Sequence, residues 1–209
     1  MDPADAADLI TELHEDRIEH AEAERFRNKA ALLIAFLAAT LAIAGLGGGN
    51  ATDDLIGNNI RASDSWAFYQ AKNVRQTAYE IAAEGLEDSL AGAAPEARAA
   101  GAKRVAAYRA NIARYDSEPD AEAPGDPLRG EGKKELRARA EFYEAGRDRA
   151  AARDDNFDLA EVALQLALVL GSVAILAVNR AIFGISLALG LIGSLLTANG
   201  FLLLVPLPF

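Results

Sequence analysis

The chain has 209 residues, no cysteine and a formal net charge of −10 at pH 7. The lack of cysteine excludes disulfides, thiolate metal sites and thiol catalysis, and the acidic balance argues against a nucleic-acid partner, which would need a basic face. The charges are segregated: residues 30–46 carry none, and residues 159–209 carry only Glu161 and Arg180. Such segregation is typical of an integral membrane protein, not of a globular domain with a mixed surface.

The first predicted element is an acidic N-terminal helix over residues 1–29, with nine acidic and four basic residues. It ends in three basic residues, Arg25, Arg27 and Lys29. The uncharged run over residues 30–46 has the length of a short membrane-spanning helix, about 17 residues, and is assigned as the first transmembrane helix. The sequence GLGGGN over residues 45–50 then marks a hinge or a close-packing site.

Residues 47–158 form a predicted helical extramembrane domain with twenty-one acidic and sixteen basic residues. Helix is expected over residues 53–92, where apolar residues recur at spacings of four and three, as in a coiled coil. Ala94-Pro95 interrupts this helix, a second helix follows, and prolines and glycines predict a loop over residues 117–132. The predicted helix seam consists of Ile60, Ala67, Ala71, Val74, Ala78 and Ile81.

A third helix is predicted to start near Lys133 and to run without a break into the second transmembrane helix, residues 159–178, because no proline intervenes. Only Asn179 and Arg180 separate it from the third transmembrane helix, residues 181–205, so the two spans form a tight hairpin. No strand pattern appears. The predicted fold class is an all-α integral membrane protein with three transmembrane helices and a large helical, coiled-coil-like extramembrane segment between spans one and two.

Small residues recur every four positions in the predicted spans, which lets helices approach closely and associate within lipid. In the third span this row consists of Ser186, Gly190, Ser194 and Ala198. An alanine-rich chain produces such rows by chance, and the row could also be used between the three spans of one subunit. Self-association is the interpretation that we favour.

No pattern indicates catalysis, and we expect no enzyme activity, no metal site and no cofactor. His14 and His20 are six residues apart and fall on different faces of a helix, so they do not form a metal-binding pair. One segment, SDSWAFYQAK over residues 63–72, combines aromatic rings with polar groups, which suits a helix contact or, as the alternative, a small-ligand site. Its candidate residues are Trp66, Tyr69, Gln70, Asn73 and Gln76.

Basic residues that flank the spans predict the orientation in the membrane. The three basic residues before the first span and Arg180 in the hairpin turn fall on the same side, which favours a cytoplasmic N-terminus with the central helices and the C-terminus outside. Arg147, Arg149 and Arg153 before the second span favour the opposite orientation. They belong to a long loop, where the rule is weak.

Three stretches carry a resemblance to a known family: HEDRIEHAEAERFRNKAALLIA (14–35), IRASDSWAFYQAKNVRQTAYE (60–80) and ISLALGLIGSLL (185–196). They are similar to the bacterial membrane-protein family catalogued as "domain of unknown function 4337", over nearly the whole chain. The resemblance implies a small inner-membrane protein with three spans, and brings no activity or catalytic residues. Two features depart from the family: GLGGGN (45–50), where the family usually continues a helix out of the membrane, and a hairpin turn poorer in basic residues.

The function that we favour from the sequence is that of a structural or scaffolding membrane protein, which self-associates and is a subunit of, or attaches to, a larger membrane complex. The alternative is a channel-like or small-ligand-binding membrane module that uses the Trp66–Gln76 helix face. The expected partners are the lipid bilayer and either further copies of the chain, a larger membrane protein complex, or both. The expected location is the bacterial inner (cytoplasmic) membrane, as a multi-pass protein.

Overall fold

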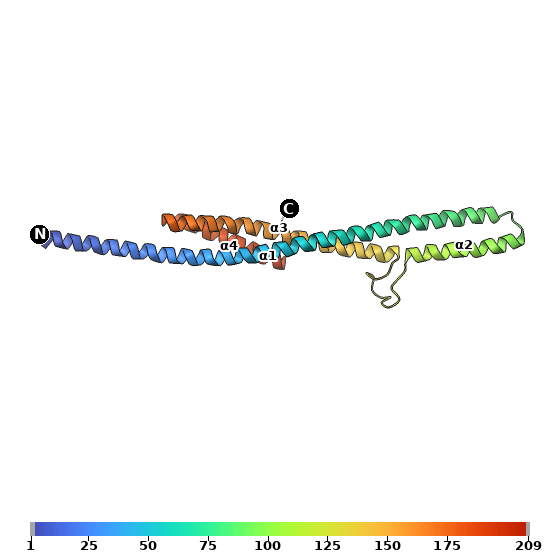
Figure 1. Ribbon diagram of the computed structural model, residues 1–209, viewed down its shortest axis with the longest axis horizontal. Helices are drawn as coiled ribbons and strands as arrows, with labels where there is room; N and C mark the ends of the chain where they lie inside the picture. The colour runs from blue at the N-terminus through green and yellow to red at the C-terminus, as the bar shows by residue number, and fades with distance from the viewer. Residues whose placement is uncertain (1–2, 208–209) are drawn as a thin grey trace. The chain divides into compact units, whose positions relative to one another are not determined.

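The computed structural model describes the backbone of residues 3–207 and the side chains of residues 13, 14 and 16–207. Its helices are α1 (Pro3–Leu90), α2 (Pro95–Asp116), α3 (Lys133–Ala177) and α4 (Arg180–Leu202) (Figure 1). Over residues 3–207 there is no β-strand, which confirms the predicted all-α class; the extended pairing there is an isolated bridge between Pro119 and Gly130. The first two residues of the predicted N-terminal helix lie outside the described residues.

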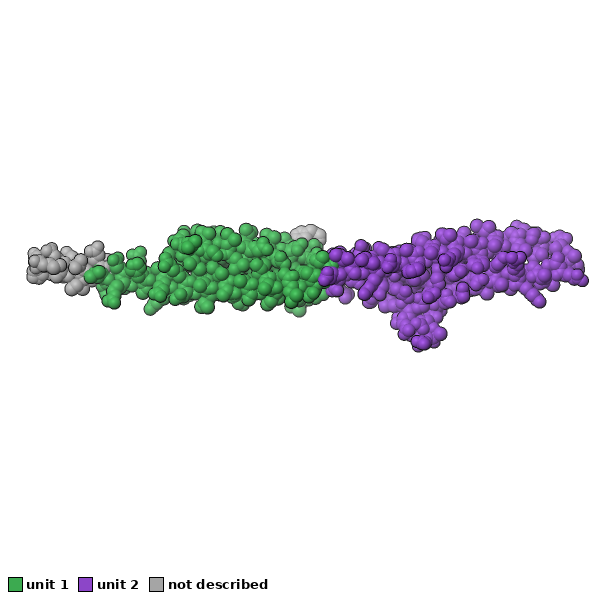
Figure 2. Space-filling view, in the orientation of Figure 1, with its two compact units in different colours: residues 1–52, 151–209 green, residues 53–150 purple. Residues whose placement is uncertain are grey.

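The chain divides into two compact units (Figure 2). Unit 1 comprises residues 1–52 and 151–209, and therefore contains the beginning of α1, the end of α3 and all of α4. Unit 2 comprises residues 53–150 and contains the remainder of α1 and α3 together with α2. Since α1 and α3 are unbroken helices, each contributes residues to both units.

Three helices, α1, α3 and α4, are long and apolar enough to cross a membrane, with mean hydropathies of 2.3, 2.2 and 2.1 in their most apolar windows. Small residues dominate the core of unit 1, and large apolar side chains lie outside it. Leu32 is 73% exposed and Leu176 is 82% exposed. Small residues inside and large ones outside are typical of helices that pack together in lipid, where burying leucine brings no advantage. The core cluster is Leu37, Ala44, Ala51, Phe157, Ala160, Leu164 and Ala167.

The segment GLGGGN is helical, and α1 passes through it without a break. A β-carbon at Gly47 would lie 2.5 Å from Phe157 Cζ, and one at Gly200 of α4 would lie 2.8 Å from Phe157 Cε1. The absent side chains therefore leave room for the Phe157 ring, which also meets the Phe201 ring edge-on at 4.9 Å. Of the two interpretations of this segment, these contacts support close packing.

A short turn joins α3 to α4, as the hairpin prediction requires. Asn179 caps α4: its side-chain oxygen accepts hydrogen bonds from the N–H groups of Ala181 (2.9 Å) and Ile182 (3.2 Å). At its other end α4 stops at Leu202, before the predicted residue 205. The reason is that Leu203 adopts a left-handed conformation, with φ +48°.

Within unit 2, α2 packs beside the last residues of α1. The first part of α3 packs beside the residues of α1 that precede them. Gln76 donates a hydrogen bond to the Ile112 carbonyl of α2 (3.4 Å). Closer to unit 2's first residues, the Trp66 indole N–H donates to Glu144 of α3 (2.8 Å). Residues 117–132 form the loop between α2 and α3. The two helices therefore contact α1 one after the other along its length.

Candidate interaction site

The contacts of α1 inside unit 2 use one face of the helix, here called the inner face. It is defined by the buried residues Ala62, Ser65, Gln76 and Ala83, which are 3, 4, 8 and 4% exposed. Alanine lets the neighbouring helix approach closely, and the polar members are satisfied: the Ser65 hydroxyl donates to the Arg61 carbonyl (2.8 Å) and Gln76 donates to α2. The inner face is therefore held by close packing and by the hydrogen bond from Gln76 to α2, while Ser65 is satisfied within its own helix.

The residues predicted as a helix seam lie on the opposite face of α1 and are exposed. We call this set the outer stripe: Ile60, Ala67, Ala71, Val74, Ala78 and Ile81. Ile60 is 54% exposed, Val74 is 69% exposed and Ile81 is 65% exposed. The outer stripe and the inner face share a seven-residue period but are offset by two positions, which is about 200° around a helix. In the described part of the chain, no helix covers the outer stripe.

Helix α1 carries most of the exposed apolar surface of unit 2, and half of the large apolar side chains exposed there belong to the outer stripe. Large apolar side chains are exposed at six positions in residues 53–150, and Phe142 of α3 is the one that does not lie on α1. The others are Ile56, Ile60, Phe68, Val74 and Ile81. Ile56, Ile60, Val74 and Ile81 fall on one side of α1, so this apolar surface is a row along the helix and not a scatter of single residues.

The Trp66–Gln76 face, for which a contact and a ligand site were both considered, is largely occupied by α2 and α3. Trp66 bonds to Glu144, and Gln76 bonds to α2. Asn73 accepts a hydrogen bond from the Lys133 ammonium group (3.2 Å), which also lies 5.8 Å from the centre of the Tyr69 ring. Gln70 is exposed. Four of the five predicted residues thus make contacts between helices.

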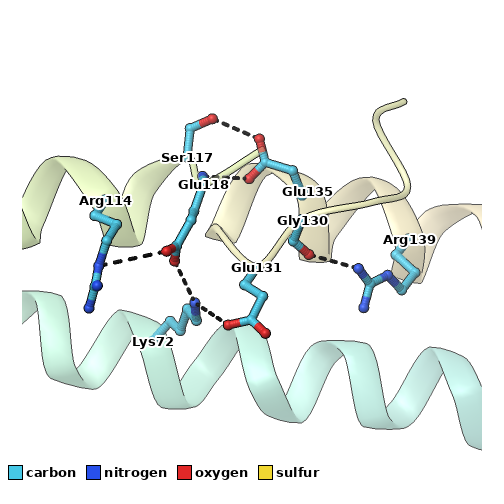
Figure 3. A network of polar contacts seen from close by, with 8 residues as sticks. All are labelled: Lys72, Arg114, Ser117, Glu118, Gly130, Glu131, Glu135 and Arg139. Atoms are coloured by element: carbon cyan, nitrogen blue, oxygen red, sulfur yellow. Dashed lines mark hydrogen bonds and ion pairs between the residues drawn. The ribbon is translucent and has the colours of Figure 1, made fainter. Parts of the chain in front are cut away.

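A network of charged groups joins the end of α2, the beginning of α3 and α1 (Figure 3). Lys72 of α1 is 14% exposed and lies 3.4 Å from Glu118 and 3.7 Å from Glu131, both of the loop. Arg114 approaches the other oxygen of Glu118 (3.8 Å). Arg139 of α3 donates to the Gly130 carbonyl (2.8 Å), which anchors the far end of the loop. The loop is thus tied to all three helices of unit 2.

Glu135, in the first turn of α3, is the buried carboxylate of this network, at 6% exposure. Its oxygens accept hydrogen bonds from the Ser117 hydroxyl (2.7 Å) and the Glu118 N–H (3.1 Å). Burial by itself raises the pKa of this carboxyl, but the hydrogen bonds from Ser117, Glu118 and its own N–H, with the charge of Lys134, together hold the pKa below its ordinary value. The ionised form therefore fastens the end of α2 to the beginning of α3.

Sequence reasoning missed this network because its members are spread over three segments. A partial signal was present at Glu135, because an acidic residue in the first turn of a helix is a common partner for free backbone N–H groups. Nothing in the sequence indicates that Lys72 would pair with Glu118, which lies 46 residues later in the chain.

The predicted row on the third span divides between two environments in unit 1. Ser186 and Gly190 are buried, Ser194 is partly buried and Ala198 is exposed. The Ser186 hydroxyl donates to the Ala167 carbonyl of α3 (2.6 Å), and a β-carbon at Gly190 would lie 2.6 Å from Leu37 Cδ2 of α1. The first two residues are therefore used between helices of one chain, which was the alternative to self-association.

The two histidines lie apart from each other and from the helix contacts described above. His14 and His20 are both exposed on α1. Asp154 accepts a hydrogen bond from the Thr52 hydroxyl (2.8 Å), a contact between α3 and α1 within unit 1. Among the described residues, no group of three His, Asp or Glu side chains could hold a metal ion.

A family model described as Domain of unknown function (DUF4337) matches residues 26–203 of the chain. The matched range includes most of α1, all of α2, α3 and α4, and the residue that caps α4. No curated protein and no solved structure matches.

Proposed function

This chain belongs to the family described as Domain of unknown function (DUF4337), and we propose that it is a membrane-anchored structural protein that self-associates through the outer stripe of α1. The observation that carries the proposal is the exposure of Ile60, Val74 and Ile81 on a helix whose inner face is already occupied. A chain that used α1 only for its own fold would need no second apolar row.

The energetics favour covering this row. Full burial of an isoleucine, valine or phenylalanine side chain contributes about 1.5–3 kcal/mol relative to exposure. Association costs at least about 4 kcal/mol in lost translational and rotational freedom, so several such side chains must be covered together. Anchoring in one membrane reduces that cost, because neighbouring copies are already confined and aligned.

The residues between the large side chains support a helix as the partner. Ala67, Ala71 and Ala78 lie between Ile60, Val74 and Ile81 along the outer stripe. Small and branched side chains at alternating spacings of three and four allow a second helix to lie close and to receive the branched residues between its own side chains.

The membrane location and orientation are also part of the proposal. Arg180 at the start of α4 lies 3.3 Å from Glu22 of α1, and the Phe183 ring contacts the Phe26 ring at 5.4 Å. The basic residues before the first span and in the hairpin turn therefore gather at one end of unit 1. That gathering supports a bacterial inner-membrane protein with this end in the cytoplasm and with residues 53–150 outside.

The test is to place a charge on the outer stripe. Val74→Asp and Ile81→Asp leave the inner face intact, so the monomer should fold normally and yield should be unchanged. Association should weaken, because the variant loses an apolar contact and must remove the new carboxylate from water. Native mass measurement of the full chain in mild detergent gives the number of copies. The matched control is Ile18→Asp, at an isoleucine of α1 that is 50% exposed but lies outside unit 2. Oligomers that persist in both stripe variants would contradict the proposal, as would a monomeric wild type.

A further inference from the structure

The end of unit 2 where α1 meets α2 carries an acidic row. Residues 76–90 of α1 contain four acidic side chains and neither Lys nor Arg. Glu80, Glu84 and Asp88 follow one another at intervals of four and are exposed. Glu87 pairs with Arg109 of α2 at 2.6 Å, whereas those three have no ion-pair partner among the side chains that the structure describes.

The outer face of α2 is basic and built from small residues. The helix has five basic residues against two acidic ones, in a chain whose net charge is −10. Val105 is buried against α1, and on the opposite side of α2 the exposed residues include Lys103, Ala107, Ala110 and Arg114. Alanine on that side leaves a shallow surface, which another helix can approach closely between the charged side chains.

The contacts between the two helices show which residues lie level along unit 2. Gln76 is beside Ile112, and Leu90 is beside Gly101, because α1 and α2 run in opposite directions (Figure 1). Residues 80–88 of α1 are therefore level with the stretch of α2 between Gly101 and Ile112. Lys103 and Arg104 lie in that stretch.

We propose that the outer stripe of α1 and its acidic row, in one copy of the chain, dock on the outer face of α2 in the next copy. The inference deepens the self-association proposed above and rests on it. When the units 2 of two copies lie side by side in one orientation and in register, the same levels of α1 and α2 meet. The acidic residues 84 and 88 of one copy then face Lys103 of its neighbour, with Arg104 at the edge of the same face.

The charges disfavour the simpler contact of α1 with α1. Two copies with the same orientation have parallel α1 helices, and a symmetric pair would place Glu84 and Asp88 against their own counterparts. Like charges in such an interface are repulsive, whereas α2 offers the opposite charge at the same level. The contact is therefore heterologous: each copy uses α1 toward one neighbour and α2 toward the other, which generates a ring or an open row.

The experiment exchanges the charges of the two surfaces in the full chain, reconstituted in mild detergent. The acid-reversed variant is Glu84→Lys/Asp88→Lys, and the base-reversed variant is Lys103→Glu/Arg104→Glu. Each alone should associate at least about tenfold more weakly than wild type, because like charges then meet. An equimolar mixture of the two should recover wild-type association, since each variant's reversed surface meets a complementary one. The control Asp155→Lys/Asp158→Lys makes the same change in net charge as the acid-reversed variant, at exposed residues of unit 1.

The outcomes separate this inference from the proposed function. Restored association in the mixture, with both single variants weakened and the control unchanged, supports docking of α1 on α2. The inference is overturned if the wild type associates and the reversed variants associate equally well, or if the mixture does not regain wild-type association. Either result leaves self-association itself intact. A wild type that remains monomeric at all concentrations overturns both.

Discussion

Leu37 of α1 occupies the space that a side chain at Gly190 of α4 would need, since a β-carbon there would lie 2.6 Å and 2.9 Å from the two Leu37 methyl carbons. Gly190→Leu should therefore insert into the membrane, because the helix stays apolar, but should separate α4 from α1. We expect a loss of about 1–3 kcal/mol in the free energy of unfolding and an unchanged number of copies. Thermal unfolding in detergent and native mass measure the two quantities.

The control for this substitution is Gly184→Leu on the same helix. A β-carbon at Gly184 meets no atom within 4 Å, so the larger side chain should be tolerated. If Gly190→Leu instead dissociates copies while leaving the unfolding temperature unchanged, the row of small residues serves contacts between chains.

Asn156 and Asn199 join α3 to α4 where the latter ends. Asn156 is 1% exposed, and its side-chain oxygen accepts a hydrogen bond from Asn199 (2.7 Å). Asn199 also bonds to both the N–H and the carbonyl of Val205, which holds the residues after α4. Asn199→Leu leaves a buried oxygen without a donor, which should cost about 1–3 kcal/mol.

The double variant Asn156→Leu/Asn199→Leu tests the cause of that loss. It removes both partners, so no buried polar group is left unsatisfied in this pair, and part of the stability should return. Thermal unfolding of the wild type, the two single variants and the double variant completes the cycle. If the loss of stability in the double variant equals the sum of the losses in the two single variants, the two side chains act independently.

The ends of the helices in unit 2 could be predicted because local residues determine them. Pro95 starts α2, and the prolines and glycines of residues 117–132 separate it from α3. The continuous helix through GLGGGN could not be predicted, because glycine disfavours helix by about 1 kcal/mol per residue. Packing of Phe157 against Gly47 and Gly48 favours the helix there, and that contact is remote in sequence.

The choice between the two faces of α1 could not be made from the sequence either. A seven-residue period was visible, and apolarity pointed to the face that carries Ile60, Val74 and Ile81. The contacts inside unit 2 use the other face, where Ser65 and Gln76 are buried and hydrogen-bonded. Polar residues on an interior face are recognisable only when their partners are known.

Acid should weaken the junction of α2 and α3 through Glu135. Its pKa in the folded protein lies below the ordinary 4.5, so the unfolded chain takes up the proton first as the pH falls. The contribution of this group to the free energy of unfolding is complete above pH 4.5 and is lost as the pH falls through the folded value. Urea unfolding, followed by the fluorescence of Trp66, the single tryptophan, reports on unit 2.

Glu135→Gln keeps the size of the side chain but not its charge. It should lower the free energy of unfolding at pH 7 by about 1–3 kcal/mol. Below pH 4.5 the free energy of unfolding should then fall less steeply with pH than in the wild type. Glu141→Gln, at a side chain of α3 that is 53% exposed, removes only an exposed ion pair with Arg137, so it should lower the free energy of unfolding far less than Glu135→Gln does. A wild type whose stability is constant from pH 6 to below the ordinary pKa would contradict this role of Glu135.

The orientation in the membrane can be tested with single cysteines, because the chain has none of its own. Glu122→Cys lies in the loop, at a side chain that is 87% exposed, and Glu24→Cys lies on α1 beside the basic residues that precede the first span. With the basic end of unit 1 in the cytoplasm, a maleimide that cannot cross membranes should label Glu122→Cys in intact spheroplasts. Glu24→Cys should be labelled only after lysis. The reverse pattern would place unit 2 in the cytoplasm and would mean that the arginines before the second span decide the orientation. Replacing Arg25, Arg27 and Lys29 by Gln should then distinguish the causes: it should invert or mix the labelling if those residues set the orientation, and should leave it unchanged if they do not.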